Sequence, residues 1–380
     1  MSDAEAEALN RRLVEELTSA GVLPDPWRPA FLATPRHWFI PDLTWEGPAG
    51  GLRARTRQAD PAAWLAAAYQ NEPIVTQVDD GVTAATSTGQ WVTSSVSKPS
   101  IVAAMLDHLA VEPGMRVLEI GTGSGWNAAL LARMVGAENV TTVEVDAGVA
   151  EHARKRLADA GISLAVVTGD GAAGHTPNAP YDRVISTAAV RRVPAAWVEQ
   201  TRPGGVILTP WGTAFDNGAL VRLTVDPDGT ASGRFVDNTV AFMWLREQRV
   251  DRAEPVDRLD GAAESVTALH PDTVAWDDYD ARFAVGVRLP DVRVRFVDAD
   301  DGSDDFVFWA QSGRSWARVD VAAGAAEHPV RQSGPRRLWD EVEAAYNWWV
   351  DAGRPPTERF GLTAWPDGHH VWLDRPGNPV

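Results

Sequence analysis

The sequence predicts an α/β fold in which a doubly wound, mostly parallel sheet carries a ligand site at the end of its first strand. The first observation is a short buried strand, Val117–Ile120, followed at once by the glycine-rich turn 121–125 and a helix over Trp126–Val135. The second is a further apolar run at 140–145, with an acid near its end. The third is the alternation of strand-like and helical segments that continues to residue 209.

The other elements of this sheet follow from apolar periodicity, with glycine and proline as stops. We expect helices at 2–20, 64–70, 101–109, 147–160 and 193–201, and strands at 74–78, 164–167, 181–187, 206–209, 220–225 and 232–240. The last two strands flank Asp226-Pro-Asp-Gly229, whose composition is that of a hairpin turn. We therefore expect the sheet to end in an antiparallel hairpin at its edge.

A length of 380 residues favours two domains, and the pattern changes after residue 252. Strands are expected there at 282–288, 292–297, 305–310 and 316–321, a helix at 335–352, and a hairpin at 362–373. We divide the chain into a helical and connector region of the catalytic domain (1–80), a cofactor-binding domain (81–250) and a C-terminal α+β accessory domain for substrate recognition (255–380). The 17 tryptophans, frequent in this last part, predict either a packed core or an aromatic binding surface.

Composition excludes several classes of function. The formal net charge of −17 opposes binding to nucleic acid and to anionic membranes, so neither is an expected partner. The absence of cysteine removes disulfides, thiolate zinc sites and cysteine nucleophiles, and suits a cytoplasmic protein. The acidic amino terminus lacks the apolar core of a signal peptide, and no run is long enough to span a membrane. We expect no metal site.

The glycine turn predicts a nucleoside-containing cofactor, because glycines let the backbone lie against a ligand and Glu144 can accept hydrogen bonds from a ribose diol. Two details favour S-adenosylmethionine over a dinucleotide. The spacing is GxGxG rather than GxGxxG, and Glu119 precedes the glycines. A carboxylate attracts a sulfonium and an ammonium group, whereas it repels a diphosphate.

A set of motifs then occurs in a fixed order along the chain. They are Ser97-Lys-Pro99, IVAAMLDHL, EIGTGSGW, Glu144, Gly169-Asp-Gly171, APYDRVISTAA and RPGGVILTPWG. With them the chain resembles the protein-L-isoaspartate O-methyltransferases over about residues 9–245, which implies the Rossmann-like sheet of class I S-adenosylmethionine-dependent methyltransferases. Trp126 departs from this family, whose members usually have tyrosine after the glycine turn.

The resemblance also implies the roles of individual residues. Ser97 maps onto the active-site serine, and Glu119, Gly121 and Gly123 onto the lining of the methionine end of the cofactor. By the same resemblance, Glu144 is expected to bind the ribose, and Asp170 with Gly171 the adenine. The expected cofactor site also includes Thr122, Trp126, Val145 and Thr187.

Four of these residues have simpler interpretations that the sequence leaves open. Ser97 suits the N-cap of the helix that follows it. Glu119 could be a buried structural acid under the glycine loop, Asp170 a purely conformational turn residue, and Thr187 a plain strand end.

Methylation of a carboxylate needs no general base, because the nucleophile is already ionised at pH 7. The tail motifs GPRRLWDEVEAAYNWW and FGLTAWPDGHHVWLD resemble the branch of the family associated with lanthipeptide and graspetide maturation. The resemblance therefore implies an enzyme that esterifies an aspartyl or isoaspartyl carboxylate in a ribosomally made, modified peptide, leading on to an aspartimide. Repair of L-isoaspartyl residues in proteins is the alternative.

Overall fold

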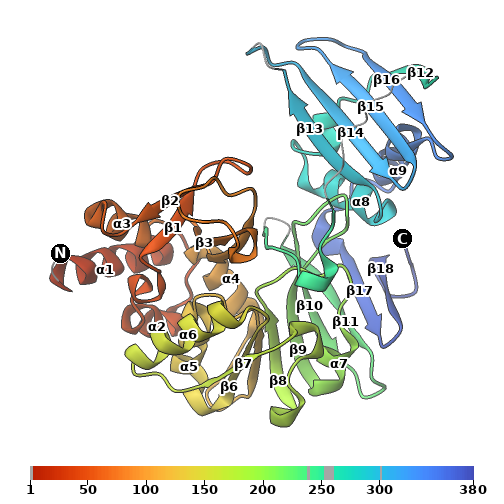
Figure 1. The fold of residues 1–380 in the computed structure, drawn as a ribbon. Coiled ribbons are helices and arrows are strands. Elements are labelled where there is room, and N and C mark those ends of the chain that lie inside the picture. The colour runs from red at the N-terminus through yellow and green to blue at the C-terminus, as the bar shows by residue number, and fades with distance from the viewer. Residues whose placement is uncertain (1–2, 238–239, 252–260, 300–301) are drawn as a thin grey trace.

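A nine-stranded sheet organises the molecule (Figure 1), in the order β18-β17-β11-β10-β9-β8-β5-β6-β7. The computed structural model describes residues 3–237, 240–251, 261–299 and 302–380. The pairs β8/β9, β5/β8, β5/β6 and β6/β7 are parallel and the others antiparallel. The strands are β5 (Val117–Ile120), β6 (Val140–Glu144), β7 (Ala165–Thr168), β8 (Tyr181–Ser186), β9 (Thr201–Trp211), β10 (Ala219–Val225), β11 (Ala231–Asp237), β17 (Phe360–Trp365) and β18 (Gly368–Leu373).

Both faces of the parallel part are covered, which explains its apolar runs. In β5, Val117 belongs to the core on one face and Leu118 to the core on the other. The first core includes residues of α4 (Pro99–Leu109), α5 (Trp126–Val135) and α6 (Ala147–Asp159), and the second includes residues of α7 (Ala195–Gln200). This topology confirms the predicted doubly wound, mostly parallel sheet.

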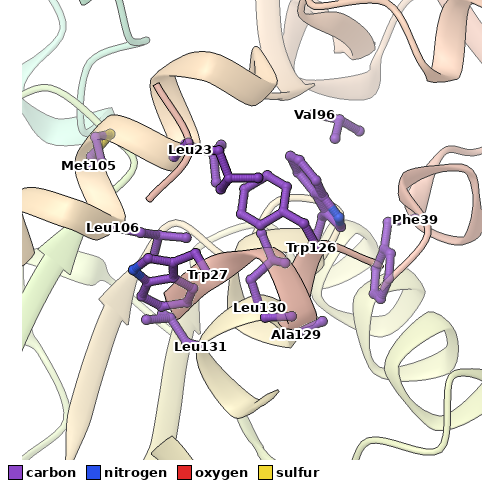
Figure 2. Packing of buried hydrophobic residues seen from close by; sticks show 14 of the residues in the cluster. Leu23, Trp27, Phe39, Val96, Met105, Leu106, Trp126, Ala129, Leu130 and Leu131 are labelled. Carbon is purple, nitrogen blue, oxygen red and sulfur yellow. The ribbon is translucent and has the colours of Figure 1, made fainter. Parts of the chain in front are cut away.

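The N-terminal region completes the first core. It contains α1 (Asp3–Ser19), α2 (Arg28–Ala33), α3 (Pro61–Ala68) and a small antiparallel sheet of β1 (Leu43–Glu46), β2 (Arg53–Thr56), β3 (Ile74–Val78) and β4 (Val92–Val96). Of these strands, the sequence predicted β3 alone. Figure 2 shows Trp27, Phe39 and Val96 packed with Trp126 in one cluster. The aromatic stretch before residue 41 therefore seats this region on the glycine-turn helix.

A second sheet, in the order β12-β16-β15-β14-β13, lies beyond the main one (Figure 1). Its strands are β12 (Ala263–Thr267), β13 (Arg293–Asp298), β14 (Phe306–Ser312), β15 (Ser315–Val321) and β16 (His328–Ser333), and its helices are α8 (Tyr279–Arg288) and α9 (Leu338–Asp351). Both helices contribute to the main core and to the core of this sheet, so they lie between the two. None of the described helices combines the length and the apolarity that a bilayer span needs.

The strand predicted at 282–288 is wrong, because this segment is helix α8. Phe283, Val285 and Val287 alternate as in a strand, but α8 packs against two cores and therefore has apolar residues on both sides. Asp278 starts the helix, since its carboxylate accepts hydrogen bonds from the amides of Asp280 and Ala281.

The C-terminal hairpin also differs from expectation. Strand β17 pairs with β11 of the main sheet, so the hairpin at 220–237 lies inside the sheet and β18 forms its edge. The division at residues 250–255 stays a proposal, and part of it lies outside the described residues, as do positions 238–239 of the predicted strand 232–240. The last hairpin nevertheless belongs to the catalytic sheet by its hydrogen bonds.

Phe360 joins these parts, because its fully buried ring contacts Phe283 of α8 and Trp348 of α9. We expect Phe360→Ala to lower the free energy of unfolding by about 3–5 kcal/mol through the cavity it leaves. Phe360→Leu, which keeps most of the volume, should cost much less. Urea unfolding followed by tryptophan fluorescence measures both, and equal effects of the two substitutions would contradict this packing role.

Candidate functional site

A cleft lies where the main parallel strands end, between the glycine turn and the N-terminal region. Its lining includes nine of the eleven predicted site residues: Ser97, Gly121, Thr122, Gly123, Trp126, Glu144, Val145, Gly171 and Thr187. Glu119 and Asp170 lie outside it. The crevice at the carboxyl ends of strands is where α/β sheets bind ligands, so the predicted residues converge on the expected place.

The glycine turn has a backbone that other residues rarely adopt. Gly121, Gly123 and Gly125 have φ values of 89°, 52° and 91°. A Cβ on Gly121 would lie 2.6 Å from the hydroxyl of Thr187, which donates a hydrogen bond of 2.6 Å to the carbonyl of Gly121. Thr187 therefore fastens the turn to the end of β8.

Glu144 ends β6 beside this turn and is almost fully buried. Its carboxylate accepts hydrogen bonds from the amides of Gly123 (2.9 Å) and Asp146 (3.1 Å). Burial is the main influence on Glu144 and raises its pKa, against the lowering effect of these two amides. Each carboxylate oxygen has a second lone pair, so the group can still accept hydrogen bonds from a ligand in the cleft.

Glu119 is completely buried beneath the turn. Its carboxylate accepts hydrogen bonds from Asn127 of α5 (2.7 Å) and from the hydroxyl of Thr142 (2.5 Å), which is itself bonded to Thr122. Burial raises the pKa of Glu119 to about 7. These contacts are those of a structural acid under the loop, and direct cofactor contact by Glu119 stays a prediction.

The Gly169-Asp-Gly171 turn divides its roles. Asp170 uses its carboxylate to accept a hydrogen bond from the amide of Ala172, which starts a short 3-10 helix. Gly171 lines the cleft, and a Cβ there would lie 2.5 Å from the side chain of Ile120. A larger residue would therefore displace the strand end, while adenine binding by Asp170 stays a prediction.

Ser97 lies between the cleft and an adjoining groove, since it lines both. It does not cap α4: Lys98 is the N-cap, and the side chain of Asn71 accepts the hydrogen bond from the amide of Ser100. Among the described residues, the Ser97 hydroxyl has no hydrogen-bond partner. The Ser97 carbonyl is held at 3.0 Å by the guanidinium of Arg36.

The sequence analysis missed the wall that faces the glycine turn. Arg246 and Arg249 line the cleft, and both pair with Asp80. Gln77 donates a hydrogen bond to Asp146, the acid that caps α6. Nothing in the sequence indicated that these segments meet. Asp80 and Arg249, for example, are more than 160 residues apart along the chain. They close the cleft over the glycine turn.

Known proteins that are similar to this chain identify its family. The model of the family described as protein-L-isoaspartate(D-aspartate) O-methyltransferase matches residues 59–249, half of the chain. The chain belongs to this family. Protein-L-isoaspartate O-methyltransferase of Thermococcus sibiricus is 37% identical over 205 residues, which cover 53% of this chain and 77% of the relative. Protein-L-isoaspartate O-methyltransferase 2 of a Polaromonas species is 38% identical over 190 residues, covering 50% and 82%.

A solved protein-L-isoaspartate O-methyltransferase is similar in fold, with a TM-score of 0.55 and 22% identity over 96% of this chain and 100% of its own. The chain is thus a member of a family of S-adenosylmethionine-dependent carboxyl O-methyltransferases, as its motifs predicted. The structural match extends through the C-terminal part. That solved protein therefore shares the fold of this chain over nearly its whole length.

The cleft fits this cofactor. Gly123 lines the cleft with a φ of 52°, a conformation that suits glycine, so its backbone can lie against a ligand with no Cβ in the way. Glu144 supplies a carboxylate for a diol. The two arginines of the cleft are paired with Asp80 rather than aimed at a phosphate site. No cluster of metal-binding side chains occurs among the described residues.

The raised pKa of Glu119 predicts a pH-dependent stability. Its ordinary pKa is 4.5 and its pKa in the folded protein about 7, so between these values the unfolded chain has lost a proton that the folded protein keeps. Stability therefore falls as pH rises through this window, by at most about 1.4 kcal/mol per pH unit. Glu119→Gln removes the titration.

Urea unfolding between pH 5 and pH 8 measures the free energy of unfolding of the wild type and of Glu119→Gln, and the difference between them is followed against pH. We expect wild-type stability, relative to the variant, to decline up to about pH 7 and then to level off. Glu151→Gln, on the exposed side of α6, is the control for the loss of one exposed carboxylate. A flat difference for Glu119→Gln would contradict the raised pKa.

Proposed function

We propose that the protein transfers the methyl group of S-adenosylmethionine to the free α-carboxylate of an L-isoaspartyl residue in a peptide or protein. The observation that carries this proposal is the position of Ser97. It lies in the wall shared by the cofactor cleft and the adjoining groove, with its hydroxyl available to a ligand. An acceptor in the groove would reach the cleft at this residue.

The residues of the cleft would bind the cofactor without taking part in proton transfer. Glu144 would accept hydrogen bonds from the ribose, and the glycine turn would bring its backbone close to the methionine end. When bound, the cofactor supplies an electrophilic methyl group, and the carboxylate oxygen forms a bond to it as the carbon–sulfur bond breaks. Because the acceptor is already ionised at neutral pH, the chain needs no general base.

Ser97 and the groove beside it would orient the acceptor carboxylate. The Ser97 hydroxyl can donate one hydrogen bond to a carboxylate oxygen. Lys98 lines the groove beside it and adds a positive charge for the same group. Holding the oxygen in line with the methyl group is where such an enzyme gains rate. Arg36 fixes the backbone of this turn by binding the carbonyls of Val96 and Ser97.

The narrower function, methylation of a modified ribosomal peptide with later aspartimide formation, has less support. The relatives compared above are named for isoaspartate, and the solved structure of that name matches nearly the whole chain. Trp126 and the tail motifs are the features that favour the peptide-maturation function. We therefore place general L-isoaspartyl methylation, the repair activity, first.

A matched pair of synthetic peptides tests this choice. We expect the enzyme to methylate a peptide with one L-isoaspartyl residue and to leave the same peptide with L-aspartyl unmodified, as measured by transfer of labelled methyl groups. Methylation of the aspartyl peptide would overturn the proposed substrate, and so would a failure to methylate either peptide.

In the same assay, Ser97→Ala should lower kcat/KM by roughly 10- to 100-fold, because it removes a hydrogen bond to a charged group. Ser163→Ala, at an exposed turn after α6, is the control and should match the wild type. An unchanged kcat/KM for Ser97→Ala would remove Ser97 from the proposed mechanism.

Glu144→Gln should weaken binding of S-adenosylhomocysteine by roughly tenfold or more, since an amide offers one acceptor oxygen where the carboxylate offers two. Isothermal titration calorimetry measures this affinity without turnover. Glu151→Gln serves again as the control for loss of one carboxylate. An affinity equal to that of the wild type would exclude Glu144 as the ribose ligand.

A further inference from the structure

The outer face of the C-terminal sheet carries a row of arginines. The helices α8 and α9 cover the opposite face, whose strand residues belong to the core. On the outer face, strand register places five side chains side by side across all five strands: Arg295 of β13, Trp309 of β14, Arg318 of β15, Arg331 of β16 and Glu264 of β12. We call these five residues the arginine row.

Arg318 and Arg331 stand directly opposite each other on neighbouring strands, and like charges in this position destabilise a sheet. Each has an acid beside it, Asp320 for Arg318 and Glu264 for Arg331, the second at 3.4 Å. Arg295 is exposed and has no acidic partner among the described residues. The row therefore keeps a positive excess, in a chain whose formal net charge is −17.

Aromatic rings give this row a platform. The guanidinium of Arg318 lies over the ring of Trp309 at 5.5 Å, and Trp309 packs on Trp316 at 5.8 Å between ring centroids. Both tryptophans are half-buried on the outer face, unlike Trp339, which fills the core. Stacking holds an arginine in a fixed orientation, so less freedom is lost when it pairs with a carboxylate.

The row also connects with the cleft. Arg295 lines a groove between the two sheets, together with Trp276 and Trp244. Trp244 in turn lines the cofactor cleft. A polypeptide that lies on the arginine row can therefore continue along this groove toward the site of methyl transfer.

We propose that the arginine row binds an acidic, extended segment of the methyl-accepting polypeptide, outside the residue that is methylated. This proposal rests on the proposed function for the identity of the polypeptide. Neighbouring strands are about 4.8 Å apart, so the three strand spacings from Arg295 to Arg331 are covered by roughly five extended residues. Their carboxylates would pair with Arg295, which has no acidic partner among the described residues, and would add to the single acid beside each of Arg318 and Arg331.

Charge decides where on this face the segment lies. Asp298 ends β13, and Asp304 and Asp305 directly precede β14 at the same end of the sheet. An acidic segment is repelled from that end and is directed across the strands, over the arginine row. The overall negative charge of the chain also disfavours nucleic acid and anionic lipid, which are long-range polyanions, more than a short acidic peptide.

Fluorescence anisotropy tests the proposal with a labelled peptide of about ten residues in which aspartate alternates with serine, at low salt. Its neutral counterpart has asparagine in place of aspartate. We expect the full-length protein to bind the aspartate peptide and not the asparagine peptide. The triple variant Arg295→Gln/Arg318→Gln/Arg331→Gln should weaken binding at least about tenfold.

The matched control removes the same charge from exposed positions elsewhere, as Arg11→Gln/Arg53→Gln/Arg133→Gln, and should bind like the wild type. Equal binding by both triple variants would overturn the proposal. So would tighter binding of an oligouridine or of phosphatidylserine vesicles than of the aspartate peptide. Near-ultraviolet circular dichroism compares the folding of the variants, and Trp316→Phe, which keeps an aromatic ring, gives a second, milder lesion of the same face.

Methyl transfer separates this proposal from the proposed function. Both triple variants should methylate a short isoaspartyl peptide that has no other acidic side chain at the wild-type rate. For the same acceptor extended by the aspartate segment, the arginine-row variant should show a raised KM and an unchanged kcat. If the wild type methylates neither acceptor, the proposed function falls, while the anisotropy measurement still decides whether the row binds acidic peptides.

Discussion

A single buried arginine ties the site together. Arg36 is fully buried, and its guanidinium donates hydrogen bonds to five backbone carbonyls instead of to a carboxylate: those of Ala68, Gln70, Glu72, Val96 and Ser97. It also lies over the ring of Trp126. Burial lowers its pKa to about 9, which still leaves it charged at neutral pH. The Arg36 guanidinium therefore contacts the end of α3, the end of β4 and the glycine-turn helix. The turn at Ser97 cannot move independently of these elements.

The sequence was sufficient for the features that depend on local chemistry. A strand buried on both faces and a turn that only glycine adopts are visible in Val117–Ile120 and the glycines after it, and Glu144 was found by its distance from that turn. Direction was harder to predict. Glu119 lies between Leu118 and Ile120, which face one core, so its side chain points into the opposite layer, toward Asn127, rather than to the strand end.

The errors come from long-range contacts. The valines of α8 alternate as in a strand, and only their burial between two sheets makes a helix the stable choice. The ion pairs of Asp80 with Arg246 and Arg249 join segments far apart in the chain, and no local pattern announces them. The pairing of β17 with β11 is of the same kind. Composition left open whether the C-terminal tryptophans form a core or a binding surface, and the structure places some in the core and some on an outer face.

Because the chain leaves the main sheet after β11 and returns to it at β17, the second sheet is an insertion with two tethers rather than an appendage with one. Two anchored ends restrict rotation of a unit far more than a single flexible linker does. Shortening the chain from its carboxyl end would thus strip strands from the catalytic sheet before it freed the inserted unit. Internal excision, with β11 and β17 rejoined directly, would remove the inserted unit and keep the strands of the catalytic sheet.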